Sequence, residues 1–274
     1  MKKWNRRTRV VVLSVILALI FIAIYAAGVM LPEELTAPSI RSTRLPPSLE
    51  HFFGTDALGR DLFFRTLKGL SVSMTVGLIA SVISAVIAVF AGIAAASGSR
   101  RMDSFINWVI DLTMGVPHMV LIMLISVAFG RGLKGLLIGV AATHWCSLAR
   151  LIRAEVMQLR SQQYVAVSRR LGKSSGWILT HHLLPHLVPQ FFVGLVLMFP
   201  HAILHEAAIS FLGYGLPPDQ PAIGIILAES MNYLSAGLWW PAVFPGLTLL
   251  LIVLLVDKLG DNLRMILDPY SAQE

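Results

Sequence analysis

Long apolar runs alternate with short polar segments along this chain. The first run, residues 10–31, reads VVVLSVILALIFIAIYAAGVML, and five more follow at residues 70–96, 105–129, 135–152, 187–211 and 239–259. A helix needs roughly 20 apolar residues to cross a bilayer. The first run exceeds the apolar core of a secretory signal, about 7–15 residues, so we expect it to be a retained span. The pattern predicts an all-α membrane protein with six transmembrane helices.

The six runs leave little chain for a water-soluble core, so we expect one membrane domain in two parts. Residues 1–68 hold the first span and a long external loop, which separates that span from the rest. Residues 69–274 form a five-helix core, interrupted by a polar loop at about residues 153–186.

Composition agrees with a membrane protein and narrows the chemistry. Hydrophobic residues make up 56% of the chain and charged residues 14%, against about 25% charged in typical soluble domains. The single cysteine, Cys146, can form neither an internal disulfide nor a CxxC metal site. The sequence lacks the GxxxxGK[ST] loop that cradles nucleotide phosphates, so we expect no ATP site of its own.

The positive charges predict the orientation in the membrane. Most Lys and Arg fall in the N-terminal segment, the loops near Arg100 and residues 150–173, and the C-terminal segment. The positive-inside rule places these segments, and therefore both termini, in the cytoplasm. The net charge of +7 then needs no nucleic acid to explain it, because a nucleic-acid site would show a basic face with interleaved aromatics.

The polar loop contains the stretch QYVAVSRRLGKSSGWILTHHLLP, residues 163–185. We expect a short helix that ends at Gly172, where a positive φ is common. Pro185 then lies near the start of the next span, where its missing N–H costs little. On this helix an apolar flank and a wet flank are expected: Val165, Ala166, Val167 and Leu171 on the first, Ser168, Arg169 and Arg170 on the second. A basic loop that merely follows the charge rule is one reading; a docking element for a cytoplasmic partner accounts better for the helix closed by glycine.

This stretch resembles the conserved cytoplasmic loop of ABC importer permeases, EAA-x3-G-x9-I-x-L-P. The counterparts are residues 166–168, Gly172 and residues 182–185, with Ala166 in place of the glutamate and His182 in place of the isoleucine. Three further segments resemble those of peptide and nickel permeases of the C-subunit type: HFFGTDALGRDLFF from residue 51, EAAISFLGYGLPP from residue 206 and LGDNLRMILDP from residue 259.

The external segments predict a helix cap and a helix break. Thr55 or Asp56 can cap a short outer helix. The glycines and prolines of residues 213–218 are expected to break the fifth span at the outer surface.

The resemblance implies the ABC importer permease fold and a transport subunit, not an enzyme, in the bacterial cytoplasmic (inner) membrane. It implies a second homologous permease, two ATP-binding cassette subunits and an extracytoplasmic substrate-binding protein as partners. ATP would bind to the cassette subunits, and this chain would bind no cofactor. The loop at about residues 153–186 would couple ATP hydrolysis to transport through these residues: Tyr164, Val165, Ala166, Val167, Ser168, Arg169, Arg170, Leu171, Gly172, Leu184 and Pro185.

Histidines within the spans point to a cargo. His201 and His205 are four residues apart and share one helix face. Ionisable groups in spans usually face the bundle interior or a water-filled path, and imidazole suits nickel and zinc. The resemblance adds that the nickel branch has H-x3-H here and a His-Trp pair, matched by residues 144–145. We expect metal at His201 and His205, nickel or a chelated transition metal as cargo, and a substrate path lined by His118, His144, His201, His205 and Glu206.

Three other interpretations stay open. The histidines can instead hydrogen-bond between packed helices. The cargo can be a di- or oligopeptide, as elsewhere in the same family. More remotely, H-x3-H-E can belong to an intramembrane metal-dependent hydrolase, although metalloproteases place the glutamate between the histidines and Glu206 follows both. The methionines near these histidines are expected to fill the core, and His181, His182 and His186 to be polar loop and interface residues.

Overall fold

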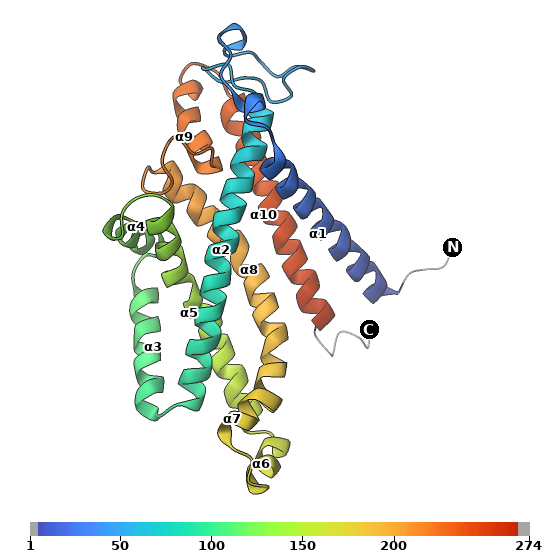
Figure 1. The fold of residues 1–274 in the computed structure, drawn as a ribbon, viewed down its shortest axis with the longest axis vertical. Coiled ribbons are helices and arrows are strands. Elements are labelled where there is room, and N and C mark those ends of the chain that lie inside the picture. The colour runs from blue at the N-terminus through green and yellow to red at the C-terminus, as the bar shows by residue number, and fades with distance from the viewer. Residues whose placement is uncertain (1–4, 268–274) are drawn as a thin grey trace.

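The computed structural model describes residues 5–267, and the regular elements of that part are all helical (Figure 1). Lys2, Lys3, Asp268 and Pro269, which entered the charge and motif arguments, lie outside the described residues. The elements are α1 Arg6–Met30, η1 Glu33–Thr36, η2 Ile40–Ser42, α2 Leu62–Ser97, α3 Arg100–Gly115, α4 His118–Ala128, α5 Leu133–Arg160, α6 Gln163–Arg170, α7 Ser175–Ile178, η3 Leu179–Leu183, α8 Leu184–Phe211, α9 Ile223–Leu234 and α10 Trp240–Leu267.

Five helical segments in the described part are long and apolar enough to cross a membrane. They are α1, α2, α5, α10 and the continuous stretch from α7 to the end of α8. The bent pair α3 and α4 makes a sixth if the two are counted as one span. The predicted all-α membrane fold is therefore confirmed, and all six apolar runs are helical for most of their length.

The third apolar run, residues 105–129, is not a straight helix. It divides into α3 and α4, which meet at an angle of 100°. The break falls at Val116 and Pro117, where Val116 adopts an extended backbone with φ −96° and ψ 140°. A residue before proline is disfavoured in the helical region, so the bend has a local cause.

The helices form an elongated bundle in which α2, α5 and α8 lie at the centre (Figure 1). The loop between α1 and α2 caps one end, and α6 and α7 form the opposite end. With 36 residues, α2 is roughly 54 Å long at 1.5 Å per residue. Because this exceeds the roughly 30 Å hydrocarbon core, α2 reaches beyond the bilayer and connects both ends.

Small side chains let the central helices approach closely. Ala80, Ala85 and Ala88 on α2 are fully buried. Ser84, also buried, donates a hydrogen bond of 3.1 Å to the carbonyl of Ala141 on α5. Small residues and hydroxyl hydrogen bonds are the usual means by which helices associate in lipid.

Helix α1 packs along α2 and α10, on the opposite side of the bundle from α3. Phe21 meets Phe199 edge to face at 5.4 Å, and Tyr25 shares a hydrogen bond of 3.1 Å with Thr75. At Gly28 a Cβ atom would lie 2.3 Å from the carbonyl oxygen of Leu67. These contacts attach α1 closely to the core. The division of the chain into residues 1–68 and 69–274 stays a prediction.

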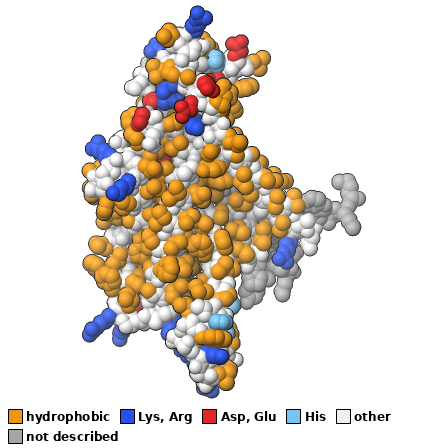
Figure 2. Space-filling view, in the orientation of Figure 1, with side chains coloured by type: hydrophobic (Ala, Val, Ile, Leu, Met, Phe, Trp, Pro, Cys, Tyr) orange, Lys and Arg blue, Asp and Glu red, His pale blue; other side chains and the backbone are white. Residues whose placement is uncertain are grey.

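The surface divides along the long axis. Figure 2 shows hydrophobic side chains over the middle of the visible face and most Lys and Arg side chains toward the two ends. Large apolar side chains of the helices are well exposed, including Phe90 of α2 at 71% and Leu251 of α10 at 64%. This distribution is the one a bilayer-spanning protein requires.

Candidate functional site

Helix α6 forms the tip of the end opposite the external loop (Figure 1). Gly172 ends it with φ +78°. The Lys173 N–H donates to the Ser168 carbonyl at 3.1 Å and the Gly172 N–H donates to the Arg169 carbonyl at 3.0 Å. This bond pair is a Schellman motif, so the expected short helix closed by glycine is present.

The expected apolar flank of α6 is mostly exposed. Of its four members, Val165 is fully buried, whereas Ala166 is exposed and Val167 and Leu171 are 54% and 73% exposed. Val165 is the one residue of α6 that is buried. Tyr164, Val167 and Leu171 thus leave large apolar side chains in contact with solvent.

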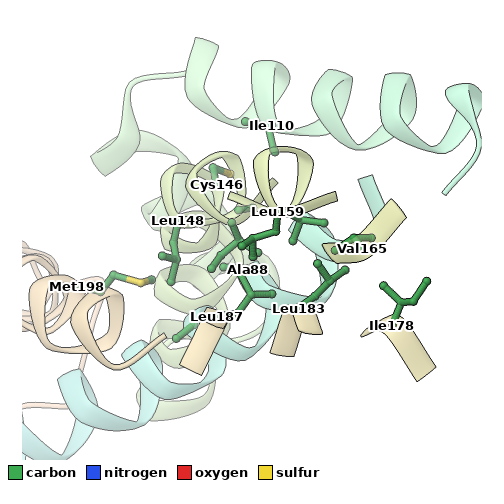
Figure 3. Close-up of a cluster of buried hydrophobic side chains, with 14 residues drawn as sticks. Ala88, Ile110, Cys146, Leu148, Leu159, Val165, Ile178, Leu183, Leu187 and Met198 are labelled. Carbon is green, nitrogen blue, oxygen red and sulfur yellow. The ribbon is translucent and has the colours of Figure 1, made fainter. Parts of the chain in front are cut away.

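The loop is nevertheless joined firmly to the spans. Val165, Ile178, Leu183 and Leu187 belong to one buried cluster with Leu159, Ala88 and other residues of the central helices (Figure 3). Pro185 occupies the first turn of α8, as expected. A force on α6 would therefore be transmitted to α5 and α8 through packed side chains.

Polar and aromatic contacts fix the loop internally. Ser168 and His182 share a hydrogen bond of 2.9 Å, and the His182 ring lies 5.2 Å from that of Tyr164. Trp177 stacks on His181 at 4.3 Å, with the Lys173 amine 4.8 Å from the indole ring centre. These histidines were expected in a loop, but His181 and His182 lie in η3 and His186 lies in the first turn of α8, because the helical chain begins before Pro185.

The external GTDxxGRD segment caps α2 differently from expectation. Neither Thr55 nor Asp56 caps a helix. Asp61 does, accepting hydrogen bonds from the Phe63 and Phe64 N–H groups at 2.8 and 3.3 Å. Asp56 instead accepts from backbone N–H groups within its own tight turn, because the chain folds back before α2 begins.

The same segment carries a buried ion network that sequence reasoning missed. Arg65 on α2 donates to both carboxylate oxygens of Glu229 on α9, at 2.5 and 2.8 Å, and to Asp56 at 3.2 Å. Arg60 bonds Asp56 at 2.6 Å and Glu229 at 3.2 Å. The side chains of Arg65 and Asp56 are 4% and 0% exposed. The network links the external loop to α9. Sequence reasoning could not pair the arginines with Glu229, because more than 160 residues separate them in the chain.

A cleft of about 800 Å³ lies where the bend between α3 and α4 meets α5 and α8. Most of its lining is apolar, and no Asp, Glu, Lys or Arg is among the described residues that line it. Four of the five residues expected on the substrate path border it, namely His118, His144, His201 and His205.

Three of these histidines converge. The ring centroids of His118, His144 and His205 lie 4.7, 4.9 and 5.1 Å apart in pairs. A ring nitrogen of each lies within 4.8 Å of the others. His201, one turn from His205, borders the cleft but is not part of this group. The expected His201 and His205 pair thus borders a common cleft, and the converging group joins His205 to His118 and His144.

Glu206 lies apart from the cleft. Its side chain is fully buried, one oxygen accepts a hydrogen bond of 2.9 Å from Ser210, and the other oxygen has no partner among the described residues. Ser210 also accepts from the Leu216 N–H at 3.1 Å, just after the glycine-containing turn that ends α8. Glu206 thus faces the external turn, and it does not border the cleft with His201 and His205.

Residues 88–266 match the family described as the binding-protein-dependent transport system inner membrane component. The chain belongs to this family of ABC importer permeases. Its relatives include a protein of Brucella abortus biovar 1 (strain 9-941) named as a peptide transport system permease, 38% identical over 95% of this chain and 87% of the relative. The dipeptide transport system permease protein of Bacillus subtilis (strain 168) is 32% identical over 93% and 79%. The oligopeptide transport system permease protein of the same strain is 31% identical over 97% and 86%.

Solved structures agree on the fold. An inward-facing form of the MetNI methionine ABC transporter has a chain with TM-score 0.62 and 14% identity, covering 76% of this chain and 98% of that one. An amino acid ABC transporter solved with histidines gives TM-score 0.54 at 16% identity, with 77% and 94% covered. The family match and the curated relatives, rather than these structures, identify the chain as a transport subunit, a multi-pass permease of the inner membrane in bacteria. Its family works with ATP-binding subunits, where ATP is hydrolysed, and with a substrate-binding protein.

Proposed function

We propose that this permease serves an importer of di- or oligopeptides. The supporting observation is the naming of relatives that match it over nearly the whole chain: peptide, dipeptide and oligopeptide transport permeases, at 38%, 32% and 31% identity. The expectation of nickel as cargo finds no support among these names. The cleft of about 800 Å³ falls within the 300–1,000 Å³ usual for small-molecule sites, so its size also suits a short peptide.

The proposal includes a second, homologous permease that completes the pathway and two ATP-binding cassette subunits below it. The cleft is not enclosed by this chain, which supports a pathway shared with a second subunit. The exposed apolar side chains of Tyr164, Val167 and Leu171 support α6 as the element that docks on an ATPase. Closure of the ATPases would then move α6, and through the buried cluster behind Val165 would tilt α5 and α8.

Nickel or a chelated transition metal is the second candidate cargo. It is favoured by one observation, the convergence of imidazoles at the cleft, because imidazole is a good ligand for nickel and zinc.

The test is direct transport. The permease is assembled with its partner permease, ATPases and binding protein in proteoliposomes, and ATP-dependent uptake of a labelled dipeptide and of ⁶³Ni²⁺ is measured. We expect saturable dipeptide uptake that stops without ATP. Uptake of Ni²⁺, with no dipeptide uptake by the same vesicles, would reject the peptide proposal in favour of the second candidate.

A further inference from the structure

Three helices contribute one imidazole each to a single point on the wall of the cleft. His118 is the first residue of α4, directly after the bend at Pro117, while His144 and His205 lie within α5 and α8. Their ring nitrogens lie within 4.8 Å of one another. Imidazoles are costly to place within spans, and three together have no packing advantage over apolar side chains.

The hydrogen bonds around His144 leave one nitrogen free. Its Nδ1 lies 2.9 Å from the carbonyl oxygen of Val140, so Nδ1 carries the proton and donates it. Nε2 therefore has an unshared electron pair, and it is buried without a hydrogen-bond partner in the described part of the chain. A metal-ligating histidine typically donates its other ring N–H to a carbonyl or carboxylate in this way.

Hydrogen bonding between helices does not account for the group. His144 bonds only within its own helix turn, at Val140 and the adjacent Thr143. His118 and Thr143 are 3.5 Å apart, at the limit of a hydrogen bond. No hydrogen bond joins His205 to another residue among those the structure describes. The three rings contact each other, Nε2 of His144 has no hydrogen-bond partner among the described residues, and the one contact between helices is the long one from His118 to Thr143.

We propose that His118, His144 and His205 together bind one divalent transition-metal ion, such as Zn²⁺ or Ni²⁺. Zinc–nitrogen bonds of about 2.0–2.1 Å place the nitrogens of a three-histidine site roughly 3–3.5 Å apart. Nitrogens within 4.8 Å reach that spacing by small rotations of the rings. The remaining coordination positions open onto the cleft. The site goes beyond the proposed transport of peptides, and it differs from the expected pair because His201 is not a ligand.

The experiment measures binding of the metal alone to the assembled transporter. The complex is stripped with a chelator, and Zn²⁺ or Ni²⁺ is titrated by calorimetry. We expect one tight site per copy of this chain. Loss of a residue that only supports a ligand typically lowers metal affinity 10–100-fold, so His144→Ala, which removes a ligand, should lower it by at least about 100-fold. His118→Ala and His205→Ala should do the same.

Two histidine variants serve as controls. His201 borders the same cleft, and His181 lies in η3, away from it. Complexes that carry His201→Ala or His181→Ala should bind the ion as tightly as the unmodified complex does. Because an alanine variant can fail to assemble, His144→Gln is titrated as well, and the unmodified complex is loaded with Co²⁺. An absorption spectrum characteristic of nitrogen-ligated Co²⁺ is expected, and it should disappear in His144→Gln.

The proposal is overturned if the unmodified complex binds no ion at this site. It is also overturned if His118→Ala or His144→Ala retains full affinity, or if His201→Ala abolishes binding while His118→Ala does not. Dipeptide uptake by the same preparations is a separate measurement. Failure of peptide transport therefore leaves the metal result intact, and the reverse also holds.

Discussion

Gly172 holds a backbone conformation that other residues adopt at a cost. At φ +78° it lies in the left-handed region, where an L-residue is penalised by roughly 1–2 kcal/mol. No atom lies within 4 Å of a Cβ built there, so space is not the obstacle. We expect Gly172→Val to loosen the end of α6 and to lower transport-linked ATP hydrolysis of the assembled importer several-fold, measured with saturating substrate and binding protein.

The control is Gly172→Asn at the same position. Asparagine tolerates the left-handed region, so it should keep most of the activity. Equal rates for the valine and asparagine variants, at equal assembly, would show that the backbone of Gly172 has no part in coupling.

The histidines show what single residues reveal before a structure is known. The spacing of His201 and His205 predicts a shared helix face, and both do border the cleft. The group that contains His205 also includes His118 and His144, which are 87 and 61 positions away in the chain. Spacing along a helix cannot reveal such neighbours, because packing between helices determines them. Glu206 faces another side because consecutive residues of a helix point about 100° apart, so its distance from the cleft was predictable from the sequence.

At the level of elements, Arg65 joins the start of α2 to α9. Its guanidinium binds both oxygens of Glu229 and also reaches the buried carboxylate of Asp56. Without Arg65, Arg60 alone among the arginines of the network would balance the fully buried Asp56, and an under-compensated buried charge destabilises the fold. We expect Arg65→Met to lower the thermal unfolding midpoint of the detergent-solubilised chain and to detach α9 from the external loop.

A matched control is the pair formed by Arg150 and Asp111, whose side chains are 44% and 67% exposed. Neither of these charges is enclosed by the protein, so Arg150→Met should lower the midpoint less than Arg65→Met does. If Arg65→Met lowers the unfolding midpoint no more than Arg150→Met does, the external network does not stabilise the fold.

Most elements follow from the sequence because a bilayer demands long apolar helices. The apolar runs fall within α1, α2, α5, α8 and α10 almost throughout. The 100° break between α3 and α4 was not predicted, because hydropathy shows how long an apolar run is but not whether the helix bends within it. Pro117 was the residue that could have indicated the break. Helix α9, with 12 residues, is too short to qualify as a span and is held by Glu229 and apolar packing.

For the whole molecule, the charge distribution and the fold suggest the same orientation. Helix α3 begins with Arg100 and Arg101. This end of α3 lies away from the external loop, and so does the end of the molecule that carries α6 (Figure 1). The positive-inside rule puts that arginine- and lysine-rich end in the cytoplasm, and there α6 can reach an ATPase. The ion network of Arg65 and the ending of α8 then face the outside.

Single cysteines test this orientation. Cys146, the only natural cysteine, is buried, so it should give little background with a membrane-impermeant maleimide. Leu49 is 92% exposed in the external loop, and Leu49→Cys should be labelled in intact spheroplasts. Arg100→Cys and Lys173→Cys should be labelled only after the membrane is permeabilised, because both belong to the positively charged end. Labelling of Lys173→Cys in intact spheroplasts would place α6 outside the cell, where no ATPase could dock on it, and would remove the coupling proposal.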